Sequence, residues 1–457
     1  MMPFPAPFPS RDIPREEILS WLRQRIAGQE GAIRRQDDGL FSLTLTLPWA
    51  VQTALPSGLD DLWFWSRARD GVALLGHGSA FCRDCASREE LARAVRSLAW
   101  SHLDPDGTGT EPAAFLGHAF NDADAMGLPS ARLVVPRILL REIRGQCSLI
   151  LSHDGPSGAP EAWIAAAERM FAALERPRDP GPASPLTRLE TVPDEALYRA
   201  RVEAARAAVS QGRLDKLVLS RRIRVRGVHA FDPARLAASL SARYPECAVL
   251  AASFGRRVLL AASPEKLASR RGTRIESLAL AGTAPRSENT AFPDRRLLAS
   301  GKDRIEHLPV VRHIAAVLRD LCREEPVVPA EPVLMELGRL QHLATPVSGR
   351  LKQGVDLLDS VHALHPTPAI AGWPRPEALA MLGELGEERG GWYSGAMGWI
   401  DRAGDGEMSV ILRCCMLDGD EAVLAAGGGI VAASTPDEEL AETELKLAAI
   451  LDSLKVA

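Results

Sequence analysis

Residues 216–225 have the sequence KLVLSRRIRV, in which an apolar run is followed by arginines that alternate with apolar residues. This pattern is typical of a β-strand. Strands are also predicted at residues 247–253 and 258–262, and long helices at 294–323 and 437–454. Because strands and helices do not follow a regular β-α-β order, we expect an α+β fold, with large antiparallel sheets packed together and helices on the outside.

The first part of the chain predicts shorter elements. Apolar residues at helical spacing indicate a helix at residues 15–27, and alternation at 40–47 indicates a half-buried strand. A strand at 131–143 contains Pro136, which predicts a sheet edge or a bulge. The other predictions are two strands joined by a turn at Asp70-Gly71, helices at 160–175 and 193–211, and glycine-containing connections at 281–283 and 427–429.

Four prolines between residues 177 and 185 make this stretch the best candidate for a linker. We therefore divide the chain into residues 1–190 and residues 191–457. Most of the residues that could carry chemistry lie in the second region.

Composition excludes several classes of protein. The 457 residues are 46% hydrophobic and 25% charged, which is typical of a globular protein. The net charge of −5 argues against a nucleic-acid partner. No stretch approaches 18 uninterrupted apolar residues, and the proline-rich N-terminus has no continuous apolar segment. We therefore expect no membrane association and a cytoplasmic location.

Two pairs of acidic residues are candidate metal ligands. Asp303 and Glu306 are three residues apart, as are Glu439 and Glu442, so each pair would share one face of a helix. Carboxylates from two helices would suit Mg²⁺, which prefers oxygen ligands and retains water. Lys446 follows Glu442 by four residues, and such pairs are also common on solvated helix faces.

Three further charged residues are candidates for catalysis or binding. Lys216 stands at the start of an apolar strand, where a partly desolvated lysine could act as a base, although an ordinary strand-start lysine is the commoner case. Glu265 follows a buried-looking strand and faces either a cleft or solvent. Arg413 lies in an apolar run and needs an anionic partner, either a substrate or a core carboxylate. The glycines at 427–429 either approach a ligand or form a plain turn.

Ten blocks in the second half occur in the order found in the chorismate-utilising enzymes, which the sequence resembles. They are KLVLSR, ASPEKL, LAGTAPR, KDRIEH, QHLATPVSG, LHPTPAIAG, GWYSGAMGW, ILRCCML, AAGGGIVAAS and ETELKL. The family contains isochorismate, salicylate, aminodeoxychorismate and anthranilate synthases. The resemblance implies that residues 1–190 are the variable N-terminal part of the same fold and that 191–457 bind chorismate.

The resemblance also implies roles for individual residues. Lys216 would be the general base that activates water, and Glu265 the general acid that protonates the leaving hydroxyl. Glu306 and Glu442 would hold Mg²⁺, with Asp303 and Glu439 in support through bound water. The implied substrate contacts are Tyr393 and Arg413 with the backbone of Gly427 at the enolpyruvyl carboxylate, Lys446 near the ring carboxylate, Gly282 and Thr283 beside the ring, and His342 near the reacting face.

Three positions favour an isochorismate synthase. Lys216 resembles the water-activating lysine, Ala281 stands where aminodeoxychorismate synthases carry a lysine, and Ala369 lies in an isochorismate-type HPTPA motif. The sequence looks most like the menaquinone-type branch, with siderophore-type members close. Salicylate synthase and aminodeoxychorismate synthase are the alternatives, and a silent binding protein is a third, which the complete set of ionisable residues disfavours. Chorismate is the expected partner, and a monomer or weak homodimer is expected.

Overall fold

The computed structural model describes residues 14–36, 39–49, 51, 53–121, 126–175, 185–285, 296–337 and 340–457. The linker predicted from the prolines at 177–185 lies outside the described residues, apart from Pro185. The proposed division at residue 190 therefore remains a prediction.

Twenty strands in the described residues form one hydrogen-bonded network. They are β1 Leu40–Thr46, β2 Leu62–Arg67, β3 Val72–Cys85, β4 Trp100–Leu103, β5 Ala113–His118, β6 Ala131–Ile143, β7 Gln146–Asp154, β8 Thr187–Val192, β9 Lys216–Arg226, β10 Ala248–Phe254, β11 Arg257–Ser263, β12 Lys266–Arg271, β13 Arg274–Pro285, β14 Val333–Leu337, β15 Leu340–Arg350, β16 Gly372–Trp373, β17 Ala396–Asp401, β18 Gly406–Val410, β19 Cys414–Asp418 and β20 Glu421–Ile430. Apart from β1–β4, the strand pairs in the described residues are antiparallel.

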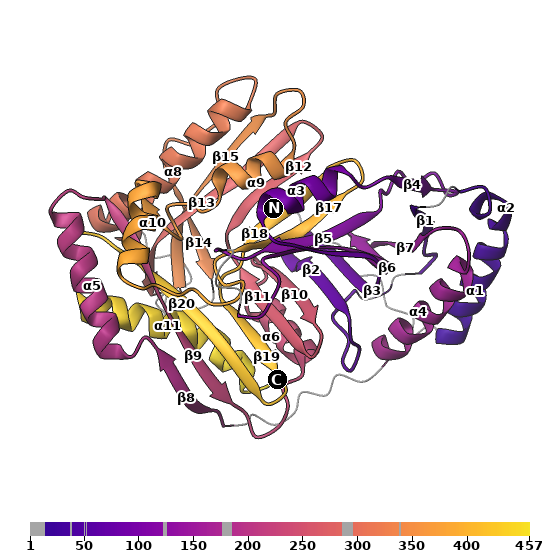
Figure 1. The fold of residues 1–457 in the computed structure, drawn as a ribbon, viewed down its shortest axis with the longest axis horizontal. Coiled ribbons are helices and arrows are strands. Elements are labelled where there is room, and N and C mark those ends of the chain that lie inside the picture. The colour runs from indigo at the N-terminus through magenta and orange to yellow at the C-terminus, as the bar shows by residue number, and fades with distance from the viewer. Residues whose placement is uncertain are drawn as a thin grey trace.

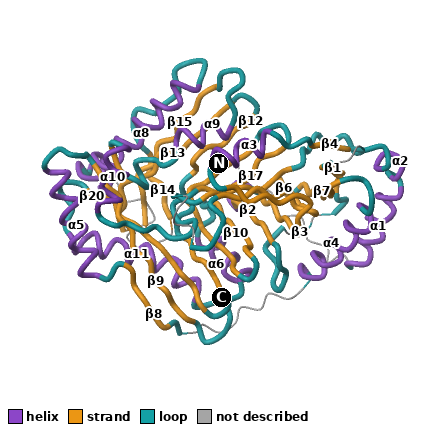
Figure 2. The backbone as a smooth tube through the Cα atoms, in the orientation of Figure 1, coloured by secondary structure: helices purple, strands orange, loops and turns teal. Residues whose placement is uncertain are grey.

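Helices cover the outside of this sheet structure (Figures 1 and 2). They are α1 Arg15–Ala27, α2 Glu30–Ile33, α3 Arg88–Arg96, α4 Ala159–Leu174, α5 Glu195–Ser210, α6 Pro233–Arg243, α7 Arg296–Ala299, α8 Gly301–Leu321, α9 Leu357–Leu364, α10 Arg375–Glu384 and α11 Pro436–Leu454, with a 3₁₀ turn at Ala68–Asp70. The predicted α+β class is confirmed. None of the helices within the described ranges is long and apolar enough to cross a membrane.

Strand pairs join the first and second regions of the chain. β2 pairs with β10, and β5 pairs with β17, where His118 lies opposite Ala396. Helix α3 lies close to α9 at the top of the view in Figure 1. The N-terminal third therefore completes the same sheets that carry the second region.

Three local predictions need correction, and for a fourth the structure decides between two predicted alternatives. Gly282 lies within β13 at a β-bulge, and residues 427–429 lie within β20, so neither glycine segment is a connection between elements. Strand β1 is buried on both faces except at Thr46, because helices and a neighbouring part of the sheet cover it. Pro136 lies in β6, which has strand partners on both sides, and the register shift occurs opposite it in β3. The prediction of a bulge there was right and that of an edge was wrong.

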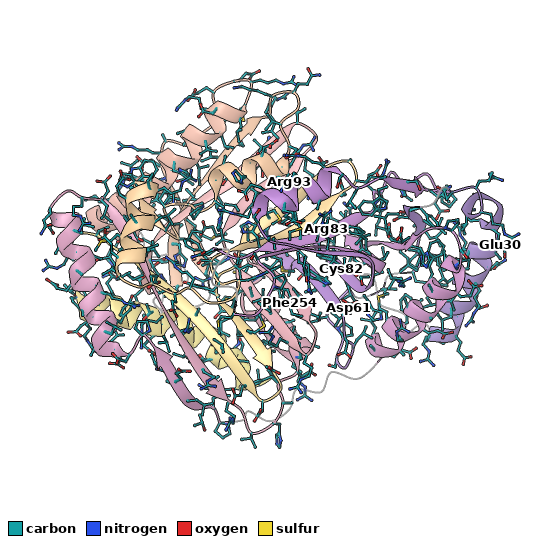
Figure 3. All side chains as sticks on the ribbon, in the orientation of Figure 1. Glu30, Asp61, Cys82, Arg83, Arg93 and Phe254 are labelled. Carbon is teal, nitrogen blue, oxygen red and sulfur yellow. The ribbon has the colours of Figure 1, made fainter. Side chains whose placement is uncertain are left out.

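An aromatic core fills the space between the inner sheet faces. Trp65 meets Trp399 edge-on at 6.2 Å between ring centroids, and Phe254, which Figure 3 labels, meets Trp392 at 4.9 Å. Such edge-to-face pairs add to the stabilisation from buried area. Next to them, the buried guanidinium of Arg67 donates to the buried carboxylate of Glu407.

We predict that Glu407→Ala lowers the free energy of unfolding by about 3–5 kcal/mol, because it leaves the buried charge of Arg67 without its main partner. Denaturant unfolding monitored by tryptophan fluorescence measures the change. Glu203→Ala is the control, since Glu203 pairs with Arg206 on an exposed helix face. An equal effect of both substitutions would contradict the prediction.

Candidate active site

A cleft with about 760 Å³ of empty space, its mouth included, opens between β13 and β20. Its lining contains Glu265, Glu306 and all eight residues predicted to contact the substrate, which are Gly282, Thr283, His342, Ala369, Tyr393, Arg413, Gly427 and Lys446. The structure therefore brings together in one cleft residues that lie up to 181 positions apart in the sequence.

Glu265 lies in the turn between β11 and β12 and is 2% exposed. Its Oε1 accepts a hydrogen bond from the hydroxyl of Thr367 at 3.1 Å. Burial raises the pKa of Glu265 to about 7, against the opposing effects of the Thr367 hydroxyl and the charge of Lys216. A carboxyl group with this pKa can hold and release a proton near neutral pH, as a general acid must.

Lys216 begins β9 and is 1% exposed. Its Nζ donates to Oε1 of Glu306 at 2.9 Å, and Glu306 lines the cleft. Gly429 makes this contact possible, because a Cβ atom there would lie 2.5 Å from Glu306 Oε1 and 2.6 Å from Lys216 Cε. Lys216 itself does not line the cleft but reaches it through Glu306.

Arg413 brings a positive charge into the cleft. It is 8% exposed, and within the described part of the chain it forms no ion pair with a carboxylate. Its Nη2 instead donates to Nε2 of His342 at 2.8 Å, and Nδ1 of His342 lies 3.1 Å from the Thr283 hydroxyl. Burial and the charge of Arg413 hold the pKa of His342 well below its usual value, so the neutral ring accepts this hydrogen bond. A buried arginine without a carboxylate favours an anionic ligand.

Tyr393 and Lys446 meet at Gly427. A Cβ atom at Gly427 would lie 2.9 Å from the Tyr393 hydroxyl, and Lys446 Nζ donates to the Gly427 carbonyl at 2.8 Å. Burial raises the pKa of Tyr393, so its hydroxyl stays protonated and can donate. This corner of the cleft therefore offers a second cation and a phenol to a ligand.

The four predicted metal ligands have two different environments. Glu306 and Glu442 are partly exposed, and each holds a lysine ammonium, Glu442 that of Lys446 at 2.7 Å. Asp303 accepts from the Ser300 hydroxyl, and Glu439 is buried and accepts from Ser434. No group of three or more His, Cys, Asp or Glu side chains in the described ranges could hold a metal ion.

The donor set nevertheless fits Mg²⁺. This ion is usually bound by one or two protein carboxylates, with water and substrate oxygens completing its octahedron. The side chains of Glu306 and Glu442 are 19% and 30% exposed, so their carboxylate oxygens remain accessible to a cation. Asp303 and Glu439 each accept a hydrogen bond from a serine hydroxyl, and their supporting role remains a prediction.

Sequence reasoning missed two residues of the site. Arg389 lines the cleft and is buried, donating to the Val218 carbonyl at 2.8 Å and to the Ser394 hydroxyl at 3.3 Å. Thr367 is the hydrogen-bond donor to Glu265. Thr367 belongs to the HPTPA motif and Arg389 directly precedes the Gly-Gly that leads to Tyr393, so their positions in the sequence were the available signals.

Comparisons with known proteins give one consistent result. Residues 29–455 match the family described as "Chorismate binding enzyme". The chain is 36% identical over 279 residues to the isochorismate synthase DhbC of Bacillus subtilis, covering 59% of this chain and 70% of that protein. It is 36% identical over 300 residues to the isochorismate synthase EntC of Escherichia coli, covering 64% and 76%. The fold matches that of MenF, the menaquinone-specific isochorismate synthase from Escherichia coli, with a TM-score of 0.76 at 24% identity over 95% of this chain and 99% of that one.

We predict that Thr367→Val raises the pKa of Glu265 above about 7. The Thr367 hydroxyl donates to the carboxylate and so favours its ionised form, and valine removes this donor at similar size. Infrared titration of the protonated carboxyl, assigned with Glu265→Gln, measures the shift. A pKa that stays the same or falls would show that the hydroxyl does not stabilise the carboxylate.

Proposed function

The chain belongs to the chorismate binding enzymes, and we propose that it is active as an isochorismate synthase, an isomerase that moves the hydroxyl group of chorismate from C4 to C2. The observation that carries this proposal is that one cleft contains both a buried arginine, which forms no ion pair with any carboxylate of the described residues, and a carboxyl group whose pKa is about 7. The first suits an anionic substrate and the second suits proton transfer to a leaving hydroxyl.

The charges of the cleft fit a substrate with two carboxylates. Arg413 and the hydroxyl of Tyr393 bind the enolpyruvyl carboxylate, and Lys446 lies toward the ring carboxylate. His342 keeps the guanidinium of Arg413 in place through the 2.8 Å hydrogen bond. These contacts fix the ring between Lys216 and Glu265.

Two residues move the protons. Lys216 accepts a proton from the water molecule that attacks C2, and Glu265 donates a proton to the hydroxyl that leaves C4. One water molecule is added and one is lost, so the reaction is an isomerisation without redox change. Burial keeps part of the Glu265 population protonated at neutral pH, which the second transfer requires.

Mg²⁺ is the cofactor that we propose. Glu306 and Glu442 would hold it, and it would neutralise the ring carboxylate and draw electron density from the diene. Asp303 and Glu439 would support these ligands from behind.

Water rather than ammonia is the proposed nucleophile. Ala281 lines the cleft and presents only a methyl group where aminodeoxychorismate synthases carry a lysine. Lys216 is the amine beside the cleft that approaches Glu265 closely enough to lower its pKa. Both observations favour hydroxyl exchange over amine transfer.

The direct test is incubation of the protein with chorismate and magnesium, followed by separation of the products. We expect isochorismate alone, and Lys216→Ala should lower turnover by about 10²–10⁴-fold, the usual contribution of a general base. Salicylate with pyruvate, a requirement for ammonia, or no product would each contradict the proposal. Retained activity in a folded Lys216→Ala protein would remove the role of this residue.

We predict that Glu442→Gln raises the magnesium concentration for half-maximal turnover at least about tenfold, because an amide is a weaker ligand than a carboxylate. Turnover is measured across a magnesium titration. Glu438→Gln is the control on the exposed side of the same helix, and its magnesium response should equal that of the unmodified protein. Equal responses of both variants would show that the metal lies elsewhere.

A further inference from the structure

A side chain from the N-terminal third reaches the loop that carries the active site. Arg88 is the first residue of α3, and its Nη1 donates to Nδ1 of His365 at 2.9 Å and to the His365 carbonyl at 3.1 Å. His365 is buried, and its Nε2 donates to the carbonyl of Ser394 at 2.8 Å. Arg88 therefore fixes one nitrogen of this ring as an acceptor, which leaves the proton on the other.

The imidazole of His365 joins two segments of the active site. The first segment continues from His365 to Thr367, which donates to Glu265, and to Ala369, which lines the cleft. The second contains Ser394, which directly follows Tyr393. A change in the orientation of this one ring would therefore move the general acid's partner and the carboxylate-binding tyrosine together.

The charges around His365 agree with a neutral ring. Burial, the neighbouring ring of His118 and the charge of Arg88 hold the pKa of His365 well below its usual value. In the part of the chain that the structure describes, Arg88 has no carboxylate partner, so its guanidinium is directed at His365.

We propose that Arg88 is a positioning residue for the isomerisation, which holds His365 so that Thr367 and Tyr393 keep their places around the substrate. This rests on the proposed function for its kinetic consequence, but the contact itself does not. It also gives the N-terminal third a part in the active site beyond completing the sheet.

The surroundings of Arg88 allow a sharp test by chemical rescue. Arg88 lines a cleft between α3 and α9 with about 860 Å³ of empty space, its open mouth included. Truncation of the arginine would connect this cleft with the edge of His365. A guanidinium ion from solution could then take the place of the missing group.

We expect Arg88→Ala to lower kcat about tenfold to a hundredfold, as small displacements in active sites do, with KM for chorismate changed less than about threefold. The alkaline limb of the pH profile of kcat should shift to higher pH. A displaced Thr367 no longer stabilises the Glu265 carboxylate, so the pKa of the general acid rises. Guanidinium at about 20 mM should restore at least about a fifth of the lost kcat, whereas sodium chloride at equal ionic strength should not.

Arg93→Ala is the matched control. Arg93 lies on the same helix and lines the same cleft, and within the described residues it forms no hydrogen bond or ion pair with residues 365–371.

 We expect Arg93, labelled in Figure 3, to tolerate alanine with unchanged kcat, pH profile and thermal stability. Unchanged kcat in Arg88→Ala would overturn the proposal, and so would a loss that guanidinium does not restore and that accompanies lower thermal stability.

A second readout does not depend on turnover. The ¹⁵N spectrum of the histidine side chains, with His365 assigned by His365→Asn, should show a proton on Nε2 and a shift of Nδ1 on Arg88→Ala. If the unmodified protein forms no isochorismate, the proposed function fails while this spectrum still tests the contact. An unchanged His365 signal in Arg88→Ala would overturn the positioning role.

Discussion

The buried positive charge of Arg413 in the wall of the cleft is the constraint on which the site depends. A buried guanidinium needs an anion, and the structure answers it with neutral groups, His342 and the phenol of Tyr393 nearby. The cost of burying the guanidinium would be offset when a carboxylate binds, because the attraction between opposite charges is strong in a desolvated site. The cleft is thus prepared for its ligand before the ligand arrives.

The shape of the cleft also depends on how closely the backbone of β20 approaches the neighbouring side chains. At Gly427 and Gly429 a side chain would collide with Tyr393, Glu306 or Lys216. At Gly428 a Cβ atom would lie 2.9 Å from Glu439 Oε2. Glycine is needed here for space rather than for a turn, and the strand geometry is kept.

Features that depend on local sequence patterns could be predicted, whereas features that depend on contacts between distant segments could not. Ordered motifs identified the cleft residues from Gly282 to Lys446, and hydrophobic periodicity located helices such as α1 and α4 within one residue of their ends. The glycine segments at 281–283 and 427–429 were wrongly placed in connections, because a turn and a close approach of the backbone have the same local signal. Arg389 and Arg88 were missed because their roles arise from contacts between distant segments, which no local pattern contains.

The pairing of β5 with β17 has a consequence for how the chain acquires its structure. His118 lies opposite Ala396, so its partner strand leaves the ribosome on the order of tens of seconds later at typical rates of synthesis. Until then the edge of β5 has no partner on that side and is open to wrong pairings. A high share of such distant contacts slows folding. Nascent chains of this protein should therefore depend on chaperones until their last quarter has been made.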